Sequence, residues 1–284
     1  MRGPKVLTAW ARQMLLQVRR WLPQRRIVIV ADARFAVRAL LARLQRLMTQ
    51  ICMVVRFRLD AALYEPAAPR RRHQQGRTPR KGKRLPRLEQ VLKDRKTVWK
   101  RVTVWNWYGE RKRVVEMASG TAVWYHPGIP IVPHRWALIR DPKGKFEPQA
   151  LLCTDLTVQP EQILKWCGMR WRVEVTFQQV RAHLGVETQR QWNEWAILRT
   201  TPALLGLFSF VTLLAHRLVK GGKLPVRQAA WYTKRLPTFS DALGVVRQLL
   251  WRRVSSRMSH RKTNMQKRKS SILERYTDAL CYAQ

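Results

Sequence analysis

The chain has 284 residues, 46% of them apolar, which is enough for a domain with a substantial core. Its 56 Lys and Arg against 17 Asp and Glu give a formal net charge of +39, which predicts a polyanionic partner such as nucleic acid. The four cysteines form no CxxC pair, which argues against a zinc site and a disulfide framework and suits a reducing cytoplasm.

The first part of the chain has the pattern of a helix followed by a β-α-β unit. Residues 6–22 show helical apolar spacing. Residues 27–31 form an apolar, β-branched run typical of a strand buried on both faces of a parallel sheet, and after a predicted helix residues 51–55 form a second short strand. Asp32 ends the first strand, where open α/β sheets present ligand-binding side chains. Two roles stay open for Asp32: it caps the following helix, or it is a catalytic acid.

The middle of the chain changes character twice. Residues 66–86 hold eight Arg or Lys and almost no large apolar side chain, so they predict a mobile arm or a loop that orders on a phosphate backbone. Residues 98–154 alternate short apolar runs with Gly and Pro turns, including one at Gly120, which predicts a β-rich insertion. The last of these strands is followed by Asp155.

A helix predicted over residues 165–185 carries the charged row around which the chain is organised. Its acid, Glu174, lies between Arg170 and Arg181 on one helical stripe. The alternative is a solvated helix face with an ordinary ion pair. The neighbouring stripe is apolar and is predicted to face a core; it consists of Val173, Phe177, Val180 and Leu184.

The remaining segments are predicted to be helical or basic. Residues 201–218 are apolar but hold 15 uncharged residues before His216, short of the roughly 20 that span a bilayer, so they predict a buried core helix with Pro202 in its first turn. Residues 226–234 and 239–254 are predicted to be helical, and residues 255–271 to form a basic tail.

Five pieces of the chain resemble, in order and spacing, the carboxyl-terminal two thirds of bacterial insertion-sequence transposases of the DDE type: IVIVADARFAVRALL, CMVVRFRLDAALY, ALLCTDL, MRWRVEVTFQQVRAHLGVETQRQW and RTTPALLGLFSFVTLLAH. Many proteins of this group carry the motif Y-x2-R-x3-E-x6-K. Arg170, Glu174 and Arg181 fall on its last three positions, with Arg in place of Lys, and Cys167 stands where the motif has Tyr. The resemblance covers roughly residues 20–220.

This resemblance implies an α/β fold of the RNase H-like type, with a β-rich insertion between the second Asp and the helix that carries the Glu. Residues 1–60 would form the first part of the core, and residues 61–148 the basic arm and the insertion. Residues 149–222 would form the second part of the core, and residues 223–284 a helical basic tail.

The resemblance also implies a chemistry, the cleavage and joining of DNA strands at insertion-sequence ends with Mg2+ or Mn2+. Two such ions about 3.5 to 4 Å apart need several carboxylate ligands. The implied catalytic metal ligands are Asp32, as the second Asp, and Glu174, with their carboxylates expected within about 5 to 8 Å of each other. The implied phosphate-binding residues are Arg170, Arg181, Arg56 and Arg58.

One acid that the resemblance implies is absent, since no Asp or Glu precedes Asp32. We therefore expect a truncated transposase that lacks its N-terminal part and is inactive in this form. Asp155 is either the missing ligand or a supporting residue. The alternative function is a non-catalytic DNA-binding fragment, a competitor or remnant. A basic RNA-binding protein would explain the charge but not the helix with Glu174.

The expected partners are double-stranded DNA, both transposon ends and target DNA, and further copies of the chain on that DNA. No membrane partner is expected. The expected location is the bacterial cytoplasm, in association with the nucleoid.

Overall fold

The computed structural model describes residues 7–47, 51–69, 76, 78–107, 110–219, 223–228, 233–259, 276–277 and 279–281. The chain divides into two compact units, Met1–Trp171 and Arg172–Gln284, which are described separately below. This division falls inside the predicted second part of the core, residues 149–222.

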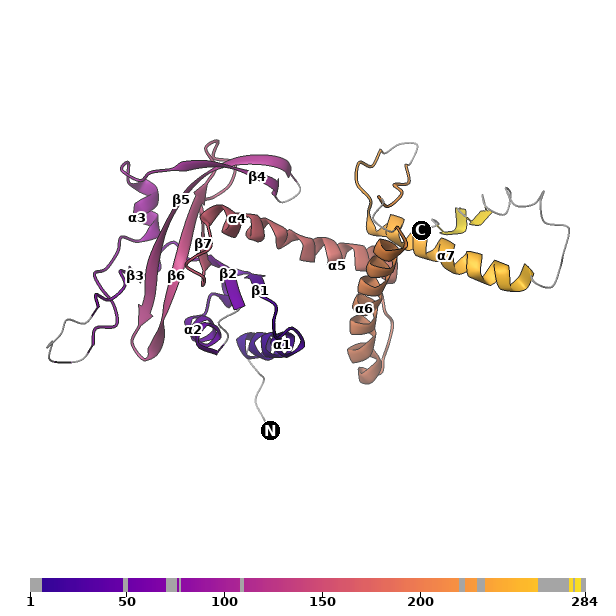
Figure 1. The fold of residues 1–284 in the computed structure, drawn as a ribbon, viewed down its shortest axis with the longest axis horizontal. Helices are drawn as coiled ribbons and strands as arrows, with labels where there is room; N and C mark the ends of the chain where they lie inside the picture. Colours follow the sequence, from indigo (N-terminus) through magenta and orange to yellow (C-terminus); the bar gives the residue numbers. More distant parts are fainter. Residues whose placement is uncertain are drawn as a thin grey trace. The chain divides into compact units, whose positions relative to one another are not determined.

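Unit 1 is built on one seven-stranded sheet with the order β1-β2-β7-β6-β5-β3, and β4 pairs with β5 (Figure 1). The strands are β1 (Ile27–Ala31), β2 (Ile51–Phe57), β3 (Leu63–Tyr64), β4 (Lys100–Trp107), β5 (Glu110–His126), β6 (Ile129–Arg140) and β7 (Gln149–Cys153). Only β1 and β2 pair in parallel, and the other pairs are antiparallel. Unit 1 is therefore a mixed α/β domain, consistent with an RNase H-like fold.

The predicted β-α-β unit is confirmed. From β1 the chain passes through a short 3-10 turn, η1 (Ala33–Phe35), and helix α2 (Arg38–Leu47) into β2, in register from Ile27 opposite Ile51 to Ala31 opposite Val55. The predicted burial of β1 on both faces is met in part: its side chains pack against apolar clusters on both faces, but β1 pairs with β2 alone among the described strands. As an edge strand, all five of its residues are only half-buried.

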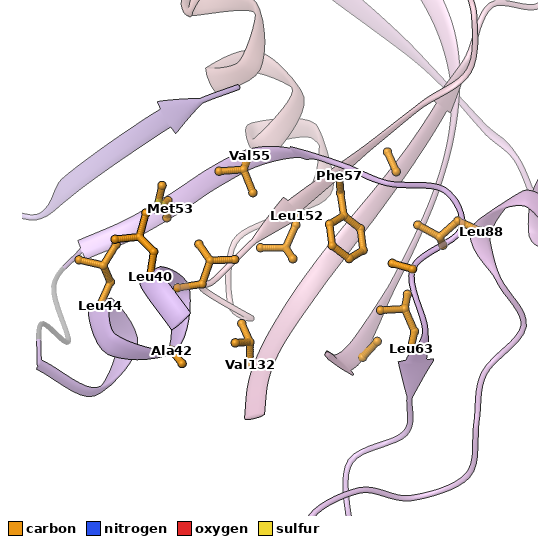
Figure 2. Close-up of a cluster of buried hydrophobic side chains, with 14 of the residues drawn as sticks. Leu40, Ala42, Leu44, Met53, Val55, Phe57, Leu63, Leu88, Val132 and Leu152 are labelled. Atoms are coloured by element: carbon orange, nitrogen blue, oxygen red, sulfur yellow. The ribbon is translucent and has the colours of Figure 1, made fainter. Parts of the chain in front are cut away.

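Two apolar clusters cover the two faces of the sheet, because residues alternate along β2. Met53 and Val55 join the cluster under α2, with Leu40 and Leu44 of that helix (Figure 2). Cys52 and Val54 join the opposite cluster, which helix α4 (Pro160–Met169) covers through its buried apolar side chains Ile163, Leu164 and Cys167. The β-α-β unit is thus fixed from both faces, and so is the strand end that carries Asp32.

The two predicted strands on either side of Gly120 are one continuous strand, β5. Gly120 lies opposite Trp136 of β6, and a Cβ atom at position 120 would approach the indole ring to 2.8 Å. The Ser119 hydroxyl donates to the Trp136 carbonyl oxygen at 2.6 Å. The glycine is therefore required by the close approach of a ring within a strand rather than by a turn, so the predicted break is wrong.

A fully buried histidine lies on β6. His134 is 0% exposed, its Nδ1 lies 3.0 Å from the Val132 carbonyl oxygen, and its ring lies 5.6 Å from that of Phe57. Burial lowers the pKa of His134 to about 4.

Acid should destabilise unit 1 through this histidine. Between pH 6.5 and about 4 the unfolded chain binds a proton at His134 that the folded chain does not, so the free energy of unfolding falls as the pH falls through this window. We expect His134 to contribute about 3 kcal/mol to this fall, and His134→Gln to lack it. Urea unfolding at pH 7 and pH 4 measures both. Equal pH dependence of the two proteins would contradict the assignment.

Unit 2 contains the helices α5 (Trp171–Leu184), α6 (Glu194–Leu218) and α7 (Phe239–Ser259). The first residue of α5, Trp171, belongs to unit 1. Unit 1 also contains α1 (Leu7–Trp21) and α3 (Leu88–Lys93). The core of unit 2 joins α6 to α7 through Val211, Ala215, Phe239, Ala242 and Val246.

Helix α6 confirms the predicted apolar helix but differs from it in two ways. It begins at Glu194, with Asn193 as its cap, so Pro202 lies inside the helix rather than in its first turn. Within unit 2 only Val211 and Ala215 of α6 are buried, so the predicted full burial is wrong. By length and composition alone α6 is able to cross a bilayer, a test that core helices of soluble proteins also pass.

The C-terminal predictions are met in part. Helix α7 covers and extends the predicted 239–254 helix, while residues 226–228 and 233–234 are not helical. Residues 229–232 of the predicted 226–234 helix lie outside the described residues, and so do residues 260–271 of the predicted basic tail.

Candidate functional site

Asp32 lies at the carboxyl end of β1, as the sequence predicts. It directly follows Ala31, the register partner of Val55, and is exposed. Its Oδ1 accepts a hydrogen bond of 2.8 Å from the Ala33 amide and caps η1, so the capping role is met for this short turn and not for helix α2, which begins at Arg38. A cap occupies one carboxylate oxygen, and the catalytic role of this exposed acid stays a prediction.

Two predicted phosphate-binding arginines lie at the same sheet edge and differ in their surroundings. Arg56 follows Val55, so it lies level with Asp32, and it is exposed. Arg58 is paired with Asp60: its Nε donates to Oδ1 at 2.8 Å, and a terminal nitrogen contacts Oδ2. This hydrogen bond raises the pKa of Arg58 and lowers that of Asp60. Arg58 must leave Asp60 before it can bind a phosphate.

Asp60 is a charged residue at this edge that the sequence interpretation missed. It follows Arg58 by two residues at the end of the run CMVVRFRLD, and this spacing was the available signal. In the structure its carboxylate accepts a hydrogen bond from the Arg58 guanidinium.

Asp155 follows β7 and is held by three hydrogen bonds. Its Oδ2 accepts from Arg26 at 2.7 Å, and its Oδ1 accepts from the Thr157 amide at 2.9 Å and from the Thr157 hydroxyl at 2.7 Å. Burial acts to raise the pKa of Asp155, but the bonds from Thr157 and Arg26 outweigh it and hold that pKa below its usual value. The carboxylate is thus already balanced by a cation.

Asp155 also lies at the opposite end of the sheet from Asp32. Because β7 runs antiparallel to β2, with Cys153 opposite Val54, Asp155 comes level with Cys52, whose partner on β1 is Val28. Asp32 lies four residues beyond Val28, roughly 13 Å along the strand. At this spacing the two acids cannot share an ion, which favours the supporting role for Asp155, and that role stays a prediction.

The predicted helix over residues 165–185 is two helices, α4 and α5. Arg170 is the C-cap of α4, and α5 carries Glu174, which is half-buried in unit 2. Asp32 belongs to unit 1 and Glu174 to unit 2. Their carboxylate separation of about 5 to 8 Å therefore stays a prediction.

Arg181 has a partner that the sequence interpretation missed. Its guanidinium binds the Glu187 carboxylate through contacts of 2.7 and 2.6 Å. Gly185, with φ +73°, ends α5, and Glu187 itself has φ +69°, which turns the chain back toward the helix. No local pattern marks an acid beyond a helix end as a partner for a residue inside the helix. A phosphate would have to displace Glu187.

Within unit 2 the predicted apolar stripe of α5 is confirmed at one end only. Val180 is buried, and Leu184 is half-buried against the cluster of α6 and α7. Val173 and Phe177 are 54% and 42% exposed.

Within unit 1 the described acids do not by themselves form a site for a pair of divalent ions. No three His, Cys, Asp or Glu side chains in this part of the chain come together as a group that could hold a metal. Asp32 and Asp155 are at opposite ends of the sheet, and Asp60 is ion-paired with Arg58.

Cations of unit 1 lie over aromatic rings, an arrangement that the sequence interpretation did not predict. Lys81 Nζ lies 3.9 Å from the ring centroid of Tyr64 and 4.4 Å from that of Tyr125. Arg140 lies 4.0 Å over Trp99. A ring face restrains a cation without neutralising it, so Lys81 remains available to phosphate. Arg140 is also neutralised by Glu116, whose carboxylate accepts from its Nε at 2.9 Å.

The fold and this site define unit 1 as a mixed α/β domain with an acid at the carboxyl end of a parallel strand pair and a cationic surface. Residues 2–122 match the family described as DDE superfamily endonuclease. The match includes Asp32, Arg56 and Arg58 but ends before Glu174. It supports a DDE-type, transposase-like domain in this part of the chain, and DNA is the substrate that such an endonuclease implies. No curated protein matches the chain.

Proposed function

We propose that this chain is a transposase-type protein that acts on the DNA ends of an insertion sequence, with Asp32 and Glu174 as carboxylates of its cleavage site. The observation that carries the proposal is the endonuclease family match over residues 2–122, a range that includes Asp32, the residue directly after β1. The net charge of +39 supports DNA as the partner. On that DNA the chain would assemble with further copies of itself.

The sheet edge with Asp32 is the part of unit 1 that would receive the DNA backbone. Arg56 lies level with Asp32 and is exposed, so it can offer two parallel N–H donors to a phosphate beside the acid. Such contacts fix the position of the backbone and carry no sequence information. Arg56 is therefore expected to set the affinity for DNA and not the choice of DNA end.

We further propose that the 284-residue chain binds DNA without cutting it. Cleavage by two metal ions needs several carboxylates around one phosphate, and the described acids of unit 1 bring no such group together at Asp32. Asp155 cannot complete a site with Asp32, because it lies at the other end of β1 and binds Arg26.

A plasmid assay tests this proposal. The chain is expected to shift supercoiled DNA in a gel, yet to produce no nicked circles above background with Mg2+ or Mn2+, because loss of one ligand costs orders of magnitude in rate. Asp32→Asn and Asp155→Asn are the paired variants. Nicking that Asp32→Asn abolishes would contradict the inactivity and support the site. Nicking that Asp155→Asn abolishes would overturn the supporting role of Asp155.

The lack of a carboxylate group at Asp32 among the described residues of unit 1 favours a second function, that of a non-catalytic fragment that competes for transposon ends. In that case the DNA bound by the chain would be protected from a complete transposase, and Asp32→Asn would protect it equally well. Failure to shift DNA at all would remove both functions.

A further inference from the structure

Two of the four cysteines face each other inside unit 1. Cys52 of β2 and Cys153 of β7 have their sulfur atoms 3.4 Å apart and are 2% and 0% exposed. Both side chains lie on the sheet face that α4 covers. Because Val54 lies opposite Cys153, the two cysteines are diagonal neighbours on adjacent antiparallel strands.

The strands hold this pair in place. The Thr154 amide donates to the Met53 carbonyl oxygen at 3.0 Å, and the Met53 amide donates to the Thr154 hydroxyl at 2.9 Å. A disulfide needs its sulfur atoms about 2.05 Å apart, so they must approach by about 1.4 Å. Rotation about the side-chain bonds of both cysteines has to supply that movement.

A small oxidant has a route to the first of these sulfurs. Cys52 lines a cavity of about 890 Å³ together with Arg26, Gln45 and Asp155. Cys153, Cys167 and Cys281 are not among the residues that line it. Cys52 is therefore the thiol that a molecule in the cavity meets first.

The surroundings also favour Cys52 as the nucleophile. The hydrogen bond between the Cys52 and Cys153 sulfur atoms, with the nearby charge of Arg26, outweighs burial and the charge of Asp155 and lowers the pKa of the Cys52 thiol. The same hydrogen bond, together with burial, raises the pKa of Cys153. The thiolate therefore forms more readily at Cys52 than at Cys153, so Cys52 is the sulfur that attacks first.

We propose that Cys52 and Cys153 form a reversible redox pair that hydrogen peroxide closes into a disulfide. The Cys52 thiolate attacks one peroxide oxygen, the O–O bond breaks, and hydroxide leaves and takes up the thiol proton as water. The Cys153 sulfur then attacks the sulfur of the Cys52 sulfenic acid. The S–S bond forms, the S–O bond breaks, and the leaving hydroxide takes the Cys153 proton. Two thiols and one peroxide give one disulfide and two waters.

The disulfide would act on the stability of unit 1. It joins β2 to β7 and closes the long chain segment between them, which removes freedom from the unfolded chain. It also removes the weak hydrogen bond from the Cys153 thiol to the Asp155 carbonyl oxygen, 3.4 Å away, which is a smaller effect in the opposite direction. Oxidation should therefore raise the thermal midpoint of unfolding, and a thiol reductant should restore the original value.

A variant with both other cysteines replaced, Cys167→Ser/Cys281→Ser, tests the pair directly. Peroxide should consume both remaining thiols, lower the mass of the intact monomer by two hydrogen atoms, and raise the thermal midpoint by roughly 5 °C or more. The matched control adds Cys52→Ser, and peroxide should then produce neither cross-link nor shift.

Each other outcome overturns the proposal: unreacted thiols, oxygen added to Cys52 without a cross-link, or a bond between two chains. Because the replaced cysteines are buried and the variant could fail to fold, the unaltered chain is mapped in parallel. Its non-reduced proteolytic digest should contain one peptide pair that joins Cys52 to Cys153 after peroxide and not before.

Discussion

Raising NaCl from about 50 to about 200 mM is expected to weaken the binding of this chain to double-stranded DNA by roughly 10³-fold or more. A protein that neutralises about six phosphates displaces their counterions, and this release loses its driving force as salt rises. The net charge of +39 and the exposed Arg56 make such a number of contacts available. Fluorescence anisotropy of a labelled duplex measures the slope of log K against log salt. A fall of less than tenfold would contradict the proposal.

Arg56 and Arg58 are a matched pair for this slope. Arg56→Gln should lower it by about one, since one phosphate contact is lost. Arg58→Gln should lower it less, because Asp60 already neutralises that guanidinium. Equal effects of the two substitutions would show that DNA displaces Asp60.

The basic arm can be tested in the same experiment. Residues 70–75 and 77 of the arm lie outside the described residues, while the Gly82 amide binds the Glu65 carbonyl oxygen and the Glu65 amide binds the Lys83 carbonyl oxygen, each at 2.8 Å. A deletion of residues 68–79 therefore removes four arginines and spares this pairing. The slope should fall by up to about 3.6. An unchanged slope would show that the arm does not touch phosphates.

Local patterns in the sequence were sufficient for much of unit 1. The β-branched run before Asp32, the amphipathic helix and the second strand predicted a β-α-β unit, and these elements pair and pack as expected. The strands of the insertion were predicted, but their continuity was not. Gly120 has the signature of a turn in a sequence, and only the indole of Trp136 on the neighbouring strand explains it.

The candidate site shows why strand direction limits what a sequence can predict. Asp32 and Asp155 both follow a short apolar strand, so both match the pattern of an acid at a strand end. Whether two such acids meet depends on whether the strands run parallel, and this is decided by long-range pairing. In this fold β7 is antiparallel to β2, which separates the two acids. The ion pair of Arg58 with Asp60 was missed because it forms after the strand has ended.

Replacing Asp241 by Ala is expected to lower the free energy of unfolding of unit 2 by about 3 kcal/mol. The Asp241 side chain is fully buried beside Phe239 and Ala242 of α7. It accepts bonds from the Thr238 amide at 2.8 Å and the Arg227 amide at 3.1 Å, and binds the Lys234 ammonium at 3.2 Å. Its loss leaves an ammonium with 20% of its side chain exposed, and two amides, without their acceptor.

The pH dependence of the stability of unit 2 is a second measurement of the role of Asp241. Burial acts to raise the pKa of Asp241, but the bonds from the Thr238 and Arg227 amides outweigh it and hold that pKa below its usual value. The contribution of Asp241 is therefore present above the unfolded pKa, near 4, and is lost as the pH falls below it. Amide hydrogen exchange in α7 reports on unit 2 directly, and Asp241→Ala should accelerate it at pH 7.

Asp60→Ala is the matched control, because Asp60 pairs with Arg58 in solvent and such exposed pairs contribute little to stability. Asp241→Asn keeps the shape and one acceptor oxygen but removes the charge, so its effect should lie between those of the control and Asp241→Ala. Equal unfolding free energies for Asp60→Ala and Asp241→Ala would show that the buried carboxylate does not hold the start of α7 to the segment that precedes it.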